Sequence, residues 1–364
     1  MLQASRLGGG LVSFSLKDDQ RLRQKLEAAP SVSDKLKELP AADGVPELVG
    51  FRVQVPVKDI TKVEVGARLA ELVREHGAHR PRLAGEQAAL GDDVRVTIIA
   101  HVNGKLLPGS IVEKWMVLEQ DEQYPELAEQ IAGMEIGEGG IFFVTLPDDF
   151  VKAPYRGKTA AFTVQLHEAI EVQQVDITHE NELLKLGRGG TLEEVVRSIA
   201  EQLRAQRVDS APMWGARGVF DALAAQSQVE IPKSLVDAEV RRRWQIVEGE
   251  LMQRLGMGLE EQREALEGWL QDDDVRGSSE HDLRALAIAK TLIARENIAP
   301  TPQQAEAFLV EMAQAVDVTP QALLADIEAK PAVRADLDDV LLRNLLIDHI
   351  MKTVQIEFID DDNT

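Results

Sequence analysis

The chain has 364 residues with 44% hydrophobic and 4% aromatic content, and its 40 Lys+Arg against 62 Asp+Glu give a net charge of −22. It is long enough for two or three domains, and its charge should repel phosphate backbones and anionic membrane surfaces. The absence of cysteine excludes disulfides and thiol chemistry, and no apolar run approaches the roughly 18 residues of a transmembrane helix. These features predict a cytoplasmic protein that binds neither nucleic acid nor membranes.

Residues 1–48 are predicted to form a short N-terminal lead that is partly disordered. Gly8-Gly9-Gly10 interrupts any regular structure near the start, and Lys17 to Ala29 has the pattern of a short helix. Prolines at positions 30, 40 and 46 punctuate the remainder.

Residues 49–90 are predicted to form a linker made of one strand and one helix. Phe51, Val53 and Val55 alternate with polar residues, as in a strand. An amphipathic run with apolar residues from Val65 to Val73 follows, at helical spacing. The segment around His76 and His79 is interpreted as the solvated end of this helix, because no third metal ligand lies nearby in the sequence.

Residues 91–172 change to the pattern of short antiparallel strands. The first candidate, Val94 to Val102, ends at Asn103-Gly104, which predicts a hairpin because both residue types tolerate positive φ. A short helix is expected at 126–131. Further strands are expected at 113–118, 139–146 and 160–166. The expected result is a helix on a bent antiparallel sheet.

Residues 173–364 are predicted to be helical to near the end of the chain. Thr191-Leu-Glu-Glu has the form of a capping box that opens a helix through Arg207. Later helices are expected at 280–297, after Thr301-Pro302, after Thr319-Pro320 and at 337–354.

A stiff corner is predicted within this region, between helices before and after Pro232. Proline restricts Ile231 to extended backbone and suits the first position of the next helix, where its missing N–H is not needed. The angle between the two helices should therefore be well defined.

The corner and the strand-rich region together resemble trigger factor, the bacterial chaperone with an FKBP-type peptidyl-prolyl isomerase domain. The corner matches the family's I/V-x-V/I-P followed by Leu-Val/Ile-Asp-x-Glu, and the resemblance extends from about Val49 to Ile359. The strand-rich region carries counterparts of several family motifs, namely Val102-Asn-Gly104, Tyr124-Pro125, Ile131-Ala-Gly133, Gly137-Glu138, Leu146-Pro-Asp-Asp-Phe150, and Arg156-Gly-Lys158 through Phe162 to Leu166.

This resemblance implies an α+β protein in which an FKBP-like domain at 91–172 is joined to an all-α, two-armed domain at 173–364, of the trigger-factor C-terminal and SurA-like type. It also implies an isomerase pocket, because a desolvating apolar cleft lowers the barrier of an Xaa-Pro bond. The family's pocket positions correspond to Ile98, Leu107, Trp115, Tyr124, Leu127, Phe150 and Phe162.

Much of that pocket differs from the family pattern. Ile98, Leu107 and Leu127 stand where aromatic rings are usual, and Phe150 replaces a tyrosine whose hydroxyl could bind substrate. Weak or absent isomerisation is therefore expected, and these residues serve equally well as the core of a retained fold.

Chaperone action needs apolar surface that adapts to many clients, and methionine repacks easily. Apolar residues of this kind cluster around the expected arm helices. The candidate client-binding residues are Met213, Trp214, Trp244, Met252, Leu255, Met257, Trp269 and Leu270.

Ribosome docking in trigger factors uses a loop that reads G-F-R-x-G-K-x-P. Here Gly50-Phe51-Arg52 and Pro56 are kept, but Gln54 replaces the second glycine and Val55 the lysine. The resemblance therefore predicts a chaperone without normal ribosome binding.

Three functions remain open from the sequence. The first is a trigger-factor-like chaperone that holds unfolded or nascent polypeptide, the second an escort or inhibitor of one dedicated client, and the third an active prolyl isomerase. No cofactor is expected, because no phosphate-binding glycine loop, nucleophile motif or metal-ligand spacing occurs.

Overall fold

The structure, a computed structural model, describes residues 38–57, 59–329 and 331–360. Within them the chain is α+β, as predicted, with one antiparallel sheet domain and a larger set of helices. The helix predicted at Lys17 to Ala29 lies outside the described residues. None of the described helices combines the length and apolar character needed to cross a bilayer.

A six-stranded sheet with the order β2-β7-β3-β4 forms the sheet domain, in which β5 also pairs with β3 and β6 with β7. All of these pairs are antiparallel. The strands are β2 (Ala78–Pro81), β3 (Asp93–Val102), β4 (Lys105–Leu106), β5 (Val112–Val117), β6 (Gly139–Thr145) and β7 (Thr159–Gln173).

The strands expected between residues 91 and 172 are confirmed, as is the hairpin at Asn103-Gly104. Both turn residues have positive φ, 53° and 78°. A register shift between Arg95 and Val96 marks a β-bulge, which increases the local bend of β3. The short helix α4 (Leu127–Ile131) packs its buried Leu127 and Ile131 into the core of this domain.

The interpretation of the segment around His76 and His79 as a solvated helix end holds for His76, the exposed C-cap residue of α3 (Lys62–Glu75), and is wrong for His79. Ala78 to Pro81 form β2 and pair with Ile170 to Gln173 at the end of β7. All four β2 side chains are exposed, so the sequence pattern carried no apolar alternation to indicate a strand.

The strand predicted around residues 51–57 exists as β1 (Arg52–Val57), but its partner was not expected. It pairs in parallel with β8 (Gln355–Asp360), near the other end of the chain, from Arg52↔Gln355 to Val57↔Asp360. Val53 and Val55 of β1 are buried in a cluster with residues of three helices. This pairing joins two segments about 300 residues apart into one structural unit.

The capping box at Thr191 is confirmed, and it opens α6 (Leu192–Gln226). This helix runs past the expected end at Arg207 and contains Pro212. Its two halves pack against different partners: the first half against α3 and the second against β1, α10 (Asp273–Arg295) and α13 (Pro331–Thr353). Tertiary packing on both sides of Pro212 keeps the helix continuous despite the local cost of proline.

The predicted corner is present between α6 and α7 (Lys233–Trp244). Pro232 has extended backbone, φ −56° and ψ 135°. It is the N-cap residue of α7, whereas the sequence pattern placed it at the first position within the helix. A π-helical turn η3 (Gln245–Gly249) and α8 (Glu250–Arg254) continue α7 without a loop. After a short turn, α9 (Leu259–Leu270) completes an arm, and α10 leads back.

The helix starts predicted at Thr301 and Thr319 are confirmed. The Thr301 and Gln304 side chains form a capping box for α11 (Pro302–Ala315), and the Thr319 hydroxyl accepts from the backbone N–H of Ala322 in α12 (Pro320–Ala329). Two smaller helical turns, α5 (Glu180–Leu183) and η2 (Leu184–Leu186), connect β7 to α6.

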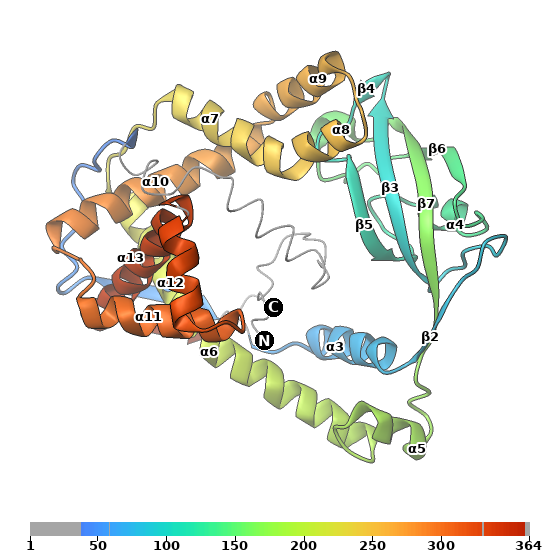
Figure 1. The fold of residues 1–364 in the computed structure, drawn as a ribbon, viewed down its shortest axis with the longest axis horizontal. Coiled ribbons are helices and arrows are strands. Elements are labelled where there is room, and N and C mark those ends of the chain that lie inside the picture. The colour runs from blue at the N-terminus through green and yellow to red at the C-terminus, as the bar shows by residue number, and fades with distance from the viewer. Residues whose placement is uncertain (1–37, 58, 330, 361–364) are drawn as a thin grey trace.

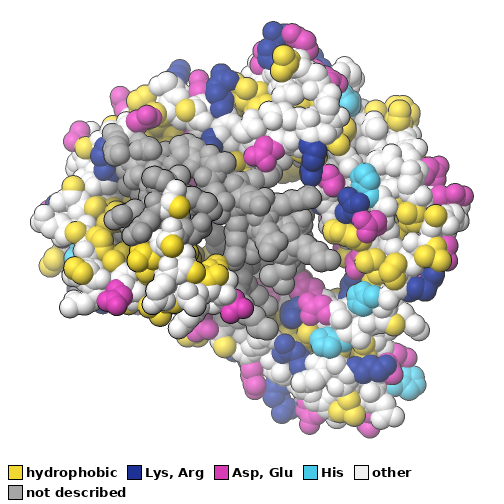
Figure 2. Space-filling model, in the orientation of Figure 1, with side chains coloured by type: hydrophobic (Ala, Val, Ile, Leu, Met, Phe, Trp, Pro, Cys, Tyr) yellow, Lys and Arg dark blue, Asp and Glu magenta, His cyan; other side chains and the backbone are white. Residues whose placement is uncertain are grey.

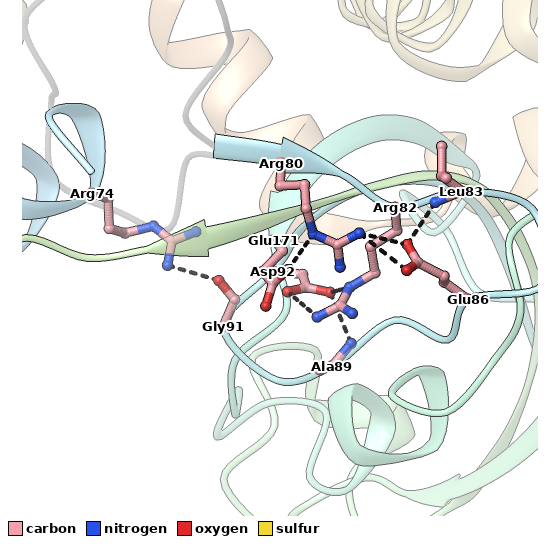
Figure 3. A network of polar contacts seen from close by, with 9 residues as sticks. All are labelled: Arg74, Arg80, Arg82, Leu83, Glu86, Ala89, Gly91, Asp92 and Glu171. Carbon is pink, nitrogen blue, oxygen red and sulfur yellow. Dashed lines mark hydrogen bonds and ion pairs between the residues drawn. The ribbon is translucent and has the colours of Figure 1, made fainter. Parts of the chain in front are cut away.

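Figure 1 shows these elements arranged in a ring, with α3 and α6 along the lower side, the sheet domain at the right and α7 to α9 along the upper side. A polar network fixes the lower attachment of the sheet domain (Figure 3). Arg74 of α3 donates to the carbonyl of Gly91 and to Asp93, while Arg80 of β2 binds Glu86 and Glu171.

Candidate functional site

The structure brings together most of the predicted pocket residues. Tyr124, Phe150 and Phe162 form an aromatic group, with the Tyr124 ring centroid 5.8 Å from Phe150 and 5.4 Å from Phe162, both edge to face. Ile98, Leu107, Leu127, Phe150 and Phe162 are all buried in the same apolar cluster. Each of these five is less than a tenth exposed, so a substrate proline reaches them only if side chains move aside.

Trp115 does not join this group. Met116, the next residue of β5, packs against the cluster, and side chains alternate between the two faces of a strand. Trp115 therefore lies on the other face, with Arg95 as its cross-strand neighbour. The assignment of Trp115 to the isomerase pocket, which the family resemblance implied, is therefore wrong.

Tyr124 retains a hydroxyl beside the aromatic group. Burial raises the pKa of Tyr124, and the negative charge of Asp121 raises it further. The phenol is therefore protonated at neutral pH and can donate a hydrogen bond. Phe150 lacks the hydroxyl of the tyrosine that is usual at its position in the family pattern. The Tyr124 ring lies against Phe150, so a phenol hydroxyl is still present beside the aromatic group.

The predicted client-binding residues divide into a buried and an exposed group. Trp244, Met252 and Trp269 are buried in the core of the arm, and Met257 and Leu270 pack against that core. This corrects the expectation that Trp244, Met252 and Trp269 are open to clients. They lie on the inward faces of α7, α8 and α9, which pack on one another.

The exposed group contains Met213, Trp214 and Leu255, which are 64%, 37% and 39% exposed. Met213 and Trp214 directly follow Pro212 in the middle of α6. The next residue, Gly215, lies against Phe358 of β8, whose side chain is 42% exposed. Exposed apolar side chains thus occur at the centre of α6 and on the strand beside it; we call Met213, Trp214 and Phe358 the α6 surface.

Two further features were not predicted. Ile141 and Phe143 of β6 are 62% and 67% exposed, and Figure 2 shows hydrophobic side chains on the sheet domain at the right of the view. The other is Glu248 in the π-helical turn, only 1% exposed.

Glu248 accepts hydrogen bonds from the indole Nε1 of Trp269 at 2.6 Å and from the backbone N–H of Ile111 at 3.2 Å. Burial raises its pKa, and these hydrogen bonds oppose the shift only in part. One sequence signal could have located it: Trp244, Glu248 and Met252 follow one another at i, i+4 spacing, so the carboxyl lies within a buried stripe.

The fold and these surfaces define a class of protein in which an antiparallel sheet domain is held by an all-helical frame with an arm and an exposed apolar surface. Residues 191–352 match the sequence model of a family described as the bacterial trigger factor protein C-terminus. The chain is thus similar in sequence to the trigger factors, and residues 191–352 match their C-terminal domain.

Several relatives match much more of the chain than this domain. The trigger factor of Hyphomonas neptunium is 23% identical over 83% of this chain and 67% of its own length, and that of Bordetella petrii is 25% identical over 86% and 70%. A solved trigger factor chaperone, described by its title as showing promiscuous substrate recognition in folding and assembly, covers 85% of this chain and 72% of its own at 16% identity and a TM-score of 0.34.

Proposed function

We propose that this protein is a chaperone that holds unfolded or partly folded polypeptide and does so without a ribosome. In this proposal residues 49–90 connect an FKBP-like domain, 91–172, to the helical domain, 173–364, and the helical domain carries the main client surface. The relatives' shared name and the C-terminal domain support the chaperone class.

The α6 surface carries this proposal. Its three side chains are large, apolar and partly or largely exposed, and they come from two elements that lie against each other. A methionine and a tryptophan side by side suit many client sequences, because the thioether adapts its shape and the indole covers a large apolar area. Exposed large apolar side chains gathered on neighbouring elements are candidates for binding polypeptide.

The position of β1 supports independence from the ribosome. Gln54 and Val55 stand at the positions of the family's docking glycine and lysine, and here they belong to a strand paired with β8. Val55 is 5% exposed and contacts α6, so this segment is part of the frame and does not project as a loop. A net charge of −22 further opposes binding to ribosomal RNA.

The test is suppression of aggregation of two unrelated, chemically unfolded proteins by the purified protein in the absence of ribosomes. Both clients should stay soluble. The double variant Met213→Ser/Trp214→Ser should roughly halve the suppressed fraction, because a few anchors carry most of the binding energy at such surfaces. Its unfolding free energy should fall by about 1–2 kcal/mol, because serine is a poorer helix former and Trp214, which is 37% exposed, loses the packing of its buried part.

Val63→Ser is the matched control, because Val63 is an apolar residue of α3 that is 81% exposed and distant in sequence from the α6 surface. Suppression by this variant should equal that of the unmodified protein. Equal suppression by the α6 double variant would contradict the assignment of the surface. Protection of one client only would favour a dedicated escort over a general chaperone.

We further propose that prolyl isomerisation is weak. The side chains at the pocket positions are packed against one another and buried, which leaves little room for a substrate proline. Ile98, Leu107 and Leu127 are aliphatic, so they cannot stack on it as aromatic rings would. On a short Xaa-Pro peptide the rate constant should fall at least about tenfold below that of the Bordetella petrii trigger factor, which corresponds to about 1.4 kcal/mol of activation free energy. A protease-coupled assay of both proteins side by side measures this ratio, and comparable rates would show that the cleft opens readily.

A further inference from the structure

The tip of the arm meets the sheet domain, and this junction closes the ring seen in Figure 1. Leu106 of β4 and Ile111, which lies between β4 and β5, are buried in the same apolar cluster as arm residues. The arm contributes Val236, Val240, Trp244, Leu251, Met252, Ala265 and Trp269 to that cluster. The sheet domain therefore covers part of the apolar core of the arm.

Polar groups lie at the centre and the edge of this junction. Glu248 of the arm accepts from the backbone N–H of Ile111 in the sheet domain, and it is almost fully buried there. Lys152 of the sheet domain pairs with Asp272, the N-cap residue of α10, with side chains 24% and 12% exposed. Arg254 of α8 pairs with Glu113 of β5 at 3.1 Å.

These polar groups reduce the cost of separating the two surfaces. Three carboxylates and two cations lose water when the junction forms, and their mutual attraction repays this loss only in part. On opening, each of them regains hydration, and that gain offsets some of the apolar contact that is lost. A wholly apolar junction of the same size would hold more tightly.

The rest of the sheet domain is held on the opposite side of the ring, through β2, β7 and the hydrogen bond from Arg74 to the Gly91 carbonyl (Figure 3). The chain enters and leaves the sheet domain there, at Ala78–Pro81 and Ile170–Gln173. The attachment to α3 does not depend on the junction with the arm, so it is the pivot for any motion that opens the junction.

We propose that the junction is a reversible clasp: the sheet domain covers a second polypeptide-binding surface on the arm, around Gly268 and Trp269, and exposes it by swinging away. This inference rests on the proposed chaperone function. The occupant after opening is an apolar segment of unfolded polypeptide, which replaces Leu106 and Ile111.

The chain offers a direct way to lock the clasp. It contains no cysteine, and an ideal Cβ at Gly268 of α9 lies 3.8 Å from the Cβ of Pro108 in the sheet domain. This separation is that of a disulfide. The double variant Pro108→Cys/Gly268→Cys should form the disulfide on mild oxidation of the folded protein and release it on reduction, so that one molecule serves as its own control.

Two measurements on the oxidised and reduced forms test the clasp. Hydrogen exchange of the backbone amides of α9 should be about tenfold slower in the oxidised form, because local opening is blocked. Suppression of client aggregation should fall severalfold on oxidation and return on reduction. The single variants Pro108→Cys and Gly268→Cys, treated alike, report any effect of the substitutions or of the oxidant.

The outcomes separate this inference from the proposed function. Equal suppression and equal exchange in both forms overturn the clasp and leave the chaperone proposal intact. Absence of suppression in either form contradicts the chaperone proposal, and exchange then still decides whether the junction opens. Failure of the disulfide to form in the folded protein overturns the junction itself.

Lys152→Ala gives the opposite perturbation and needs no new covalent bond. It removes one cross-junction ion pair while the Asp272 cap of α10 remains. Exchange in α9 should become faster and suppression should rise, because Asp272 then lacks a counter-charge in the closed junction. Unchanged exchange in this variant, together with unchanged exchange in the locked form, would show that the sheet domain and arm are a rigid unit.

Discussion

Glu248→Ala is expected to lower the free energy of unfolding by about 3 kcal/mol, because it leaves buried donors without an acceptor. The Trp269 indole N–H and the Ile111 backbone N–H both donate to this carboxylate, and both lie where water has little access. Each unsatisfied buried donor destabilises the folded state by about 1–3 kcal/mol. Removing the carboxylate also removes the cost of burying it, which offsets part of this destabilisation.

Urea denaturation followed by tryptophan fluorescence measures this loss, with Glu260→Ala as the matched control. Glu260 is on the neighbouring α9, with a side chain 81% exposed, so its removal should change stability by less than about 0.5 kcal/mol. Glu248→Gln should be intermediate, since its amide keeps one acceptor oxygen. A Glu248→Ala variant as stable as the control would show that water replaces the carboxylate in the junction.

The difference between the unmodified protein and Glu248→Gln should also depend on pH. The pKa of Glu248 is raised in the folded state by burial, so folding favours its protonated form. The stabilisation from this raised pKa is complete below the unfolded pKa, near 4.5, and is lost as the pH rises through the folded value. Glutamine does not titrate, so the destabilisation by Glu248→Gln should be larger at pH 5 than at neutral pH.

Gly218→Ala is expected to destabilise the protein by about 1–3 kcal/mol, although alanine is the better helix former. A Cβ at position 218 of α6 would lie 2.6 Å from the Cγ2 atom of Val55 in β1. Val55 is buried and β-branched, so its side chain has few alternative positions and β1 must move away from the helix.

Gly277→Ala is the control for this substitution. Gly277 is exposed within α10, and no atom lies within 4 Å of its ideal Cβ, so alanine there should stabilise by up to about 1 kcal/mol. Combining Gly218→Ala with Val55→Ala should cost less than the sum of the two single changes, which a double-mutant cycle in urea measures. A neutral or stabilising Gly218→Ala would mean that β1 and α6 are less closely packed than the structure shows.

Local features of the fold could be predicted because their causes are local. Asn103 and Gly104 form the expected turn since both residues adopt positive φ without large strain. Thr191 and Glu194 satisfy each other's backbone groups at the start of α6, and the same holds for Thr301 and Gln304. Strands β3, β5, β6 and β7 followed from their sequence patterns because one face of each packs on a shared core.

The candidate site was predicted less completely. The aromatic group of Tyr124, Phe150 and Phe162 was named in advance, and so were the exposed Met213 and Trp214. Spacing along a helix, however, cannot distinguish an apolar side chain that faces solvent from one that faces another helix. Trp244, Met252 and Trp269 were therefore assigned to a surface and are found in a core.

The sequence by itself determined the α+β class, the starts of α6, α7, α11 and α12 and the corner at Pro232, because turn chemistry, capping and hydrophobic periodicity act over a few residues. Only the tertiary structure decided the pairing of β1 with β8, the continuity of α6 through Pro212 and the burial of Glu248 beneath Ile111. Each of these depends on partners more than a dozen and up to about 300 residues away, and the free energy that fixes them comes from packing across the chain.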